Sequence, residues 1–115
     1  MLVNFSPRNA EAWAEEQRCS YQAMYLRALH RLAHYYHEHG DHSAAIMICQ
    51  RALVQEDCDE ESHRLLLARY GAQGLRHLAV RQYQLYVHTL QTELGLAPSA
   101  EMELFYHQVP QYHSH

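Results

Sequence analysis

Five of the chain's 11 histidines lie between His30 and His42, and imidazole is the side chain best suited to metal binding or to proton exchange near neutral pH. On a helix, His30 and His34 are one turn apart and His34 and His37 are three residues apart, so either pair offers two metal ligands. The sequence contains neither the H-E-x-x-H nor the H-x-x-E-H arrangement of zinc enzymes. A solvated helix face is therefore favoured over a metal site, and we predict no resident metal, with His30, His34 and His37 as the only candidate ligands.

Arginines form a second group of charged residues that could bind a ligand or a partner. No acidic residue occurs between Ser62 and Thr92, a stretch that contains Arg64, Arg69, Arg76 and Arg81. Such a stretch can make a positive patch for an acidic partner or for phosphate. Arginines distributed over two antiparallel helices cannot all face one way, so pairing with neighbouring carboxylates is the favoured interpretation.

Covalent catalysis has no support in the sequence. Cys19, Cys49 and Cys58 have no histidine and acid paired beside them, and no G-x-S-x-G run or phosphate-binding glycine loop occurs. The odd number of cysteines and the lack of a C-x-x-C pair favour reduced thiols, and therefore a cytoplasmic location. We predict a protein that is not an enzyme and that needs no cofactor.

Composition limits the remaining classes. The 115 residues suit a single domain over residues 1–115, and the 4 glycines and 3 prolines favour long helices over many short strands. The net charge of -4, with no lysine, argues against direct contact with nucleic acid. No apolar run approaches the length of a membrane span, and the first residues do not resemble a signal peptide.

The apolar spacing predicts five helices and no strands. Their expected ranges are 7–39, with a break allowed near residues 19–20, then 41–56, 59–73, 75–94 and 99–109. Ser6 followed by Pro7 suits the first helix start, while Gly40, Gly74 and Gly95 suit helix ends. In the first helix, an inward face is expected at Tyr21, Tyr25, Leu29, Leu32 and Tyr36.

The chain matches itself when it is shifted by 34 residues. Leu32 falls on Leu66, and the other matches are Tyr36 on Tyr70, Gly40 on Gly74, Ala45 on Ala79, Cys49 on Tyr83 and Leu53 on Val87. A helix-turn-helix period of this length is typical of tetratricopeptide repeats. We therefore predict an all-α fold with two tetratricopeptide-like hairpins stacked as a right-handed superhelix and closed by a C-terminal capping helix.

Several motifs together resemble a known family. They are A-E-A-W-A-E-E-Q-R near the start, Gly40-Asp41, Glu60-x-x-His63-Arg64-Leu65-Leu66, Ala79-x-x-x-Tyr83, and the run Glu93-Leu94-Gly95-Leu96-Ala97-Pro98. Over residues 11–109 the chain resembles the bacterial transcriptional activator domain (BTAD) of SARP-type regulators. The resemblance implies a helical, tetratricopeptide-like fold and a role in regulating transcription through protein contacts. The winged-helix DNA-binding domain that accompanies it in the family is expected to be absent from this chain.

The resemblance also implies partners. We expect a protein partner: a neighbouring winged-helix or receiver domain, the transcription machinery, or a second copy of the chain in a homodimer. In family members further helices precede the A-E-A-W segment, so we expect Trp13 to leave an uncovered apolar surface here. Tyr35 lies off the inward face and is a candidate partner anchor.

The remaining candidates for partner contact follow from the fold. Repeat solenoids bind through the concave face, which is made by the first helix of each hairpin. This places His30, His34, His37, Arg64 and Arg69 among the expected contact residues. Two other functions stay open at this point: a tetratricopeptide-like scaffold unrelated to transcription, and a histidine-rich metal-binding module.

Overall fold

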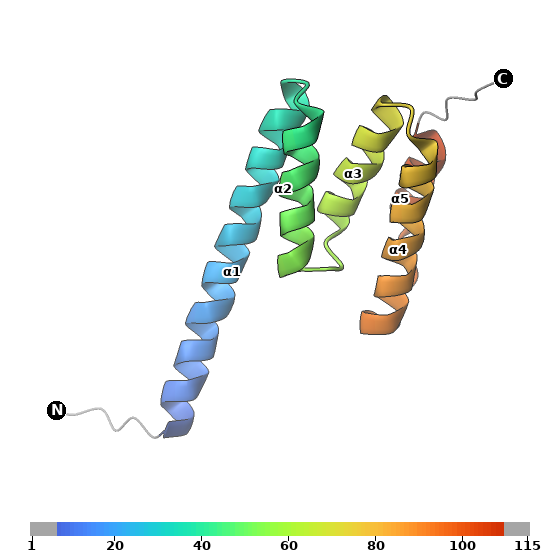
Figure 1. The fold of residues 1–115 in the computed structure, drawn as a ribbon. Coiled ribbons are helices and arrows are strands. Elements are labelled where there is room, and N and C mark those ends of the chain that lie inside the picture. The colour runs from blue at the N-terminus through green and yellow to red at the C-terminus, as the bar shows by residue number, and fades with distance from the viewer. Residues whose placement is uncertain (1–6, 110–115) are drawn as a thin grey trace.

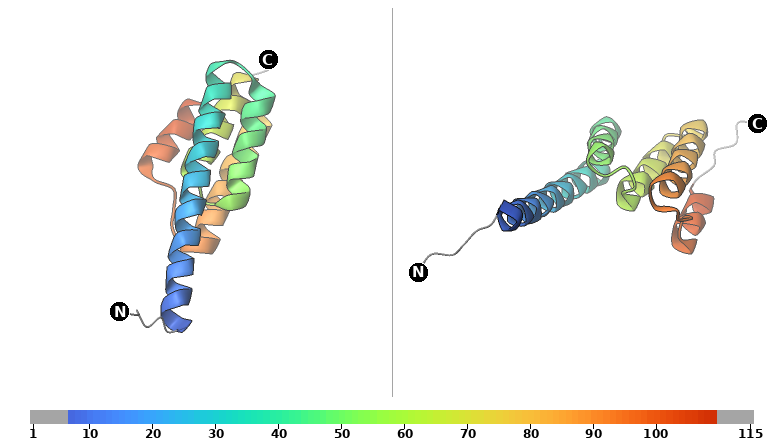
Figure 2. Two further views of the ribbon diagram at one scale, coloured as in Figure 1. Left: turned by 90° about the vertical axis from the view of Figure 1, so that its left-hand side faces the viewer. Right: turned by 90° about the horizontal axis from the view of Figure 1, so that it is seen from below.

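The computed structural model describes residues 7–109, and every regular element among them is an α-helix (Figure 1). The helices are α1 (Pro7–Glu38), α2 (His42–Gln55), α3 (Glu60–Ala72), α4 (Arg76–Leu94) and α5 (Ala100–Gln108). Consecutive helices run antiparallel, so α1 pairs with α2 and α3 pairs with α4, and α5 lies against α3 (Figure 2). The all-helical, tetratricopeptide-like fold expected from the sequence is confirmed. None of the described helices is long and apolar enough to cross a membrane.

Small residues lie at the points where the helices of each hairpin meet. Ala45 is fully buried and Ala79 is 3% exposed, and Cys49, one turn after Ala45, is also buried. Gly40 and Gly74 end the first helix of each pair with φ of +73°, a conformation that costs glycine little. The positions matched by the 34-residue shift therefore have matching structural roles.

Side-chain caps define where three helices begin. The carboxylates of Asp41 and Asp59 accept hydrogen bonds from the backbone N–H groups of Ala44 and Ser62, each at 3.1 Å. Ser99 caps α5 in the same way. Ser6, which was expected to cap α1, lies outside the described residues.

Helix α1 differs from the sequence expectation in two respects. It is continuous through residues 19–20, so the allowed break is not present. The expected inward face is only partly correct: Leu29 is buried and Tyr36 is half-buried as expected, but Tyr21, Tyr25 and Leu32 are 65%, 41% and 39% exposed, and Ala33, which was not expected there, is buried. The reason is that α2 packs only along the C-terminal part of α1 (Figure 1), and Ala33 of this part belongs to the buried core cluster that also contains Cys49 of α2.

Candidate interaction groove

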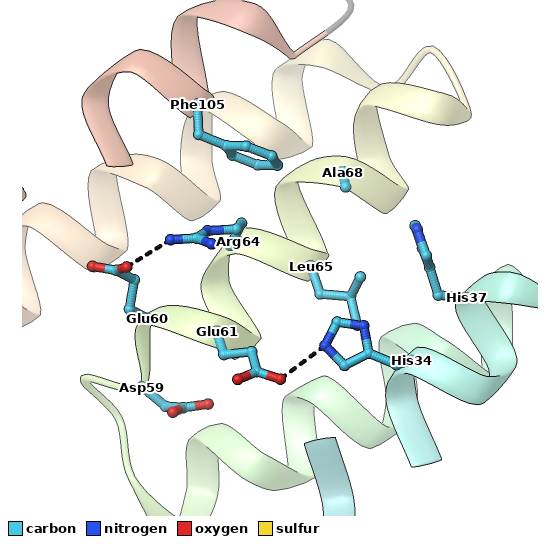
Figure 3. Close-up of a pocket in the computed structure, with 9 residues that line it drawn as sticks. All are labelled: His34, His37, Asp59, Glu60, Glu61, Arg64, Leu65, Ala68 and Phe105. Atoms are coloured by element: carbon cyan, nitrogen blue, oxygen red, sulfur yellow. Dashed lines mark hydrogen bonds and ion pairs between the residues drawn. The ribbon is translucent and has the colours of Figure 1, made fainter. Parts of the chain in front are cut away.

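A groove of about 680 Å³ lies between α1, α3 and α5 (Figure 3). Helices α1 and α3 are the first helices of their hairpins, which in repeat solenoids form the concave binding face. Its lining combines charged and apolar side chains: His34, His37, Asp59, Glu60, Glu61, Arg64, Leu65, Ala68 and Phe105.

The acidic end of the groove is the N-terminus of α3, where the helix dipole favours negative charge. Two histidines of α1 reach this end. The Nε2 atom of His30 lies 2.6 Å from a carboxylate oxygen of Asp59, and the Nε2 atom of His34 lies 2.8 Å from one of Glu61. These contacts connect α1 to α3 at the acidic end of the groove.

Arg64 connects α3 to α5 on the opposite side of the groove. Its guanidinium donates a hydrogen bond to Glu60 at 2.7 Å and lies 5.6 Å from the centre of the Phe105 ring, within cation–π range. Glu60 also accepts from the hydroxyl of Tyr86, which stays protonated because burial and the nearby Glu60 carboxylate raise the pKa of Tyr86 to about 12. Glu60 thus links α3 to α4 directly, and it is connected to α5 through Arg64.

The opposite end of the groove is lined by His37 and Ala68, away from the three carboxylates (Figure 3). His37 has a buried Nδ1 atom without a hydrogen-bond partner, and burial, followed by the charge of Arg69, lowers its pKa. Arg69 donates to the Nδ1 atom of His42 at 2.6 Å, and no carboxylate among the described residues pairs with it. Because a lowered pKa leaves His37 neutral near pH 7 and Arg69 does not line the groove, the charge of the lining is concentrated at its acidic end.

The predicted contact residues separate into two groups. His34, His37 and Arg64 line the groove, and His30 holds its wall through Asp59. Arg69, Tyr35 and Trp13 lie outside the lining. Tyr35 stacks on His39 with ring centres 4.1 Å apart, and Trp13 is 59% exposed on the distant half of α1.

The sequence interpretation missed the remaining lining residues. Asp59, Glu60, Glu61 and Phe105 fall within the predicted helix ranges 59–73 and 99–109 but were not among the expected contact residues. Opposite charges on α1 and α3, each on the first helix of a hairpin, were the available signal. The sequence does not give the distance between α1 and α3, so it could not show that the histidines of α1 reach the carboxylates of α3.

The three candidate metal-ligating histidines do not converge. Among residues 7–109 the only group with three ligand atoms within 4.8 Å of one another is Glu56, Asp57 and Cys58. His30 and His34 instead use their Nε2 atoms on carboxylates. The geometry gives no support to a metal centre built from His30, His34 and His37.

The paired helices and the concave groove define a tetratricopeptide-like helical-repeat domain. A family model described as Bacterial transcriptional activator domain matches residues 4–109. The match spans most of the chain, and the chain belongs to the bacterial transcriptional activator domain family. It is therefore a domain of the transcriptional-regulator type. No match was found among curated proteins or among solved structures.

Proposed function

We propose that this chain is a non-enzymatic protein-interaction module of a bacterial transcriptional regulator, and that its groove holds a segment of a partner protein. The observation that carries the proposal is the groove itself, which spans three helices and combines a charged end with apolar side chains. Leu65, Ala68 and Phe105 supply apolar contact area, while His34, His37 and Arg64 supply directional polar contacts. Such a mixture is typical of protein-binding surfaces.

Two of the three thiols, those of Cys49 and Cys58, support a role without covalent catalysis. Burial raises the pKa of Cys49 to about 12, and burial, followed by the neighbouring Asp57, raises the pKa of Cys58. Thiols with a raised pKa are poor nucleophiles at neutral pH. The net charge of -4 supports a protein partner over direct contact with nucleic acid. Such a module acts in the cytoplasm, on a neighbouring winged-helix or receiver domain, on the transcription machinery, or on a second copy.

A reporter assay in bacteria tests the proposal. The chain is fused to a heterologous DNA-binding domain upstream of a weak promoter, and reporter expression is measured. We expect activation that is lost when Arg64→Glu reverses the charge at the centre of the groove. Leu85→Ser, at an exposed position on α4, is the matched control and should leave activation unchanged. No activation by the native fusion, or equal activation by the Arg64→Glu fusion, would contradict the proposal.

The family match weighs against the scaffold unrelated to transcription. The separation of the three histidines leaves the metal-binding alternative without a specific observation in its favour.

A further inference from the structure

The floor of the groove follows one face of α3. Glu61, Leu65 and Ala68 are four and three residues apart, so they lie one above another on that helix (Figure 3). At 1.5 Å per residue, Glu61 and Ala68 are separated by about 10 Å along the helix axis. Phe105 of α5 and His37 of α1 line the groove beside the apolar part of this floor. The floor therefore begins with a carboxylate and continues with apolar side chains.

Glu61 is the carboxylate of the groove that a ligand can reach most easily. Its side chain is 45% exposed, against 12% for Asp59 and 39% for Glu60. Asp59 is also occupied as the cap of α3, and Glu60 accepts hydrogen bonds from Arg64 and Tyr86. Recognition of a ligand by charge should therefore fall mainly on Glu61.

Within residues 7–109 the carboxylate of Glu61 pairs only with histidine side chains. One oxygen lies 2.8 Å from the Nε2 atom of His34, and the other lies 3.5 Å from the Nδ1 atom of His30. An arginine or a lysine forms charge-assisted hydrogen bonds to a carboxylate, which are roughly twice as strong as those between neutral groups. A cationic side chain can thus pair with Glu61 in place of the longer contact with His30.

The charge of the lining favours a cationic ligand. The lining contains three carboxylates and one guanidinium, so negative groups are in excess when histidine is counted as neutral. The dipole of α3 offsets roughly half a charge at its N-terminus, which leaves the excess negative. Burial, and then the charge of Arg69, lower the pKa of His37, so this histidine adds no positive charge near pH 7 that would repel a cation.

We infer that the groove binds a segment of a partner protein in which an arginine or a lysine lies about 10 Å from an apolar residue. The cationic side chain pairs with Glu61, and the apolar side chain packs on Leu65 and Ala68 beside Phe105. In an extended segment this separation corresponds to about three residues. The inference rests on the proposed function, because it specifies the chemistry of the segment that the groove holds.

Arg64 has a different role in this arrangement. Its guanidinium lies between the carboxylate of Glu60 and the ring of Phe105, so its charge is used within the groove. Arg64→Glu repels Glu60 and releases Phe105, and it therefore disrupts the wall on which the apolar side chain packs. Loss of binding in the Arg64→Glu variant and in Glu61 variants thus has different causes.

Selection from a random peptide library displayed on phage tests the inference, with the full chain as bait. We expect enrichment of sequences in which an arginine or a lysine lies about three residues from a large apolar residue, and Glu61→Arg should abolish it. Glu16→Arg makes the same charge change at an exposed position of α1, about 27 Å along the helix from His34, and should leave the enrichment unchanged. No enrichment, enrichment of acidic sequences, or identical enrichment on Glu61→Arg protein overturns the inference.

Fluorescence anisotropy of the most enriched peptide measures the contribution of the charge. Glu61→Gln keeps an acceptor for His34 and removes the charge, so it should weaken binding by about tenfold while the circular dichroism spectrum stays native. Replacing the cationic residue of the peptide by glutamine should weaken its binding to the native chain to a similar extent. Unchanged affinity of the Glu61→Gln variant contradicts the inference. If arginine amide alone competes as effectively as the peptide, the groove recognises a small cation and the inference is wrong.

This inference and the proposed function fail separately. Reporter activation that is lost with Arg64→Glu, together with a selection that yields no basic peptides, retains the proposed function and overturns the inference. Selection of basic peptides without reporter activation contradicts the role in transcription and leaves the preference of the groove for basic segments in place.

Discussion

Two alanines set how closely the paired helices approach. Ala45 and Ala79 are buried at equivalent positions of the two hairpins, where a larger side chain has no space to enter. Their role was predictable from the 34-residue spacing alone, because the tetratricopeptide pattern requires a small residue where two helix axes come closest.

Replacing Ala79 by leucine should lower the free energy of unfolding by about 1–3 kcal/mol, since the added methylenes force the helices of the second hairpin apart. Urea denaturation followed by circular dichroism measures the change. Ala72→Leu, at an exposed position near the end of α3, serves as control and should change stability by less than about 0.5 kcal/mol. Equal stability of the Ala79→Leu variant and the native chain would show that Ala79 does not limit the approach.

His63 is a buried histidine held in its neutral form. Its Nε2–H donates to the carbonyl of Asp57 at 2.9 Å, and its Nδ1 atom accepts from the Gln82 amide at 2.9 Å. Its ring also packs 4.7 Å from that of Tyr86. Burial lowers the pKa of His63 below its ordinary value of 6.5, against the smaller opposing effect of its hydrogen bond to Asp57.

The stabilising contribution of neutral His63 should therefore be present above pH 6.5 and lost as the pH falls below it. In that window the unfolded chain binds a proton that the folded chain does not yet bind. We expect His63→Gln to lose less stability than the native chain between pH 7.5 and about pH 5. His88→Gln, at an exposed site, should follow the native pH dependence. Parallel pH profiles for native and His63→Gln protein would exclude this role.

At the scale of single residues, the site was only partly predictable. His34, His37 and Arg64 were expected on the concave face, and they line the groove. Their neighbours Glu61 and Phe105 were not identified, because pairing across α1, α3 and α5 depends on interhelical distances that a linear pattern does not contain.

Helix α3 is the central element, because it contacts α1, α2, α4 and α5. Asp59 starts it with two functions: its carboxylate caps Ser62 and accepts the contact from His30. A change at Asp59 therefore affects both the helix and its attachment to α1.

Asp59→Ala should lower the free energy of unfolding by about 1–2 kcal/mol through loss of the cap. Asp59→Asn keeps a side-chain acceptor for the cap and removes the charge beside His30, so it should cost less. The difference between the two variants, measured by thermal unfolding at pH 7, isolates the cap. Equal costs would assign the whole effect to the contact with His30.

Helix boundaries were well predicted, because caps and left-handed glycines are local signals. Each observed helix begins and ends within one residue of its expected range. The orientation of α1 was not predictable in the same way. The expected face included Leu29, which is buried, but also Tyr21 and Tyr25, which are exposed, and it omitted Ala33, which is buried. The face that a helix buries depends on its neighbours as well as on its own apolar residues.

At the scale of the whole molecule, the hairpins form a row in which each unit contacts mainly its neighbours. Met102 of α5 is fully buried at one end of this row. Because contacts are mainly between neighbouring units, a change near Met102 should destabilise the adjacent helices more than the α1–α2 hairpin.

Met102→Ala should lower the free energy of unfolding by about 2–5 kcal/mol by leaving a cavity. Amide hydrogen exchange should then become faster in α3, α4 and α5, with a smaller change in α2, because local opening spreads mainly to adjacent units. Leu104→Ala, at an exposed position of the same helix, is the control. Equal acceleration in every helix would instead mean that the chain unfolds as one cooperative unit.

The only tryptophan, Trp13, lies on the projecting half of α1, far from the core around α3. Intrinsic indole fluorescence therefore reports on the surroundings of that helix alone. The emission wavelength will follow events along α1, while denaturation of the second hairpin will be almost invisible to it. Trp13 fluorescence thus reports on the α1 end of the chain, and a second spectroscopic signal is needed to follow the unfolding of α3, α4 and α5.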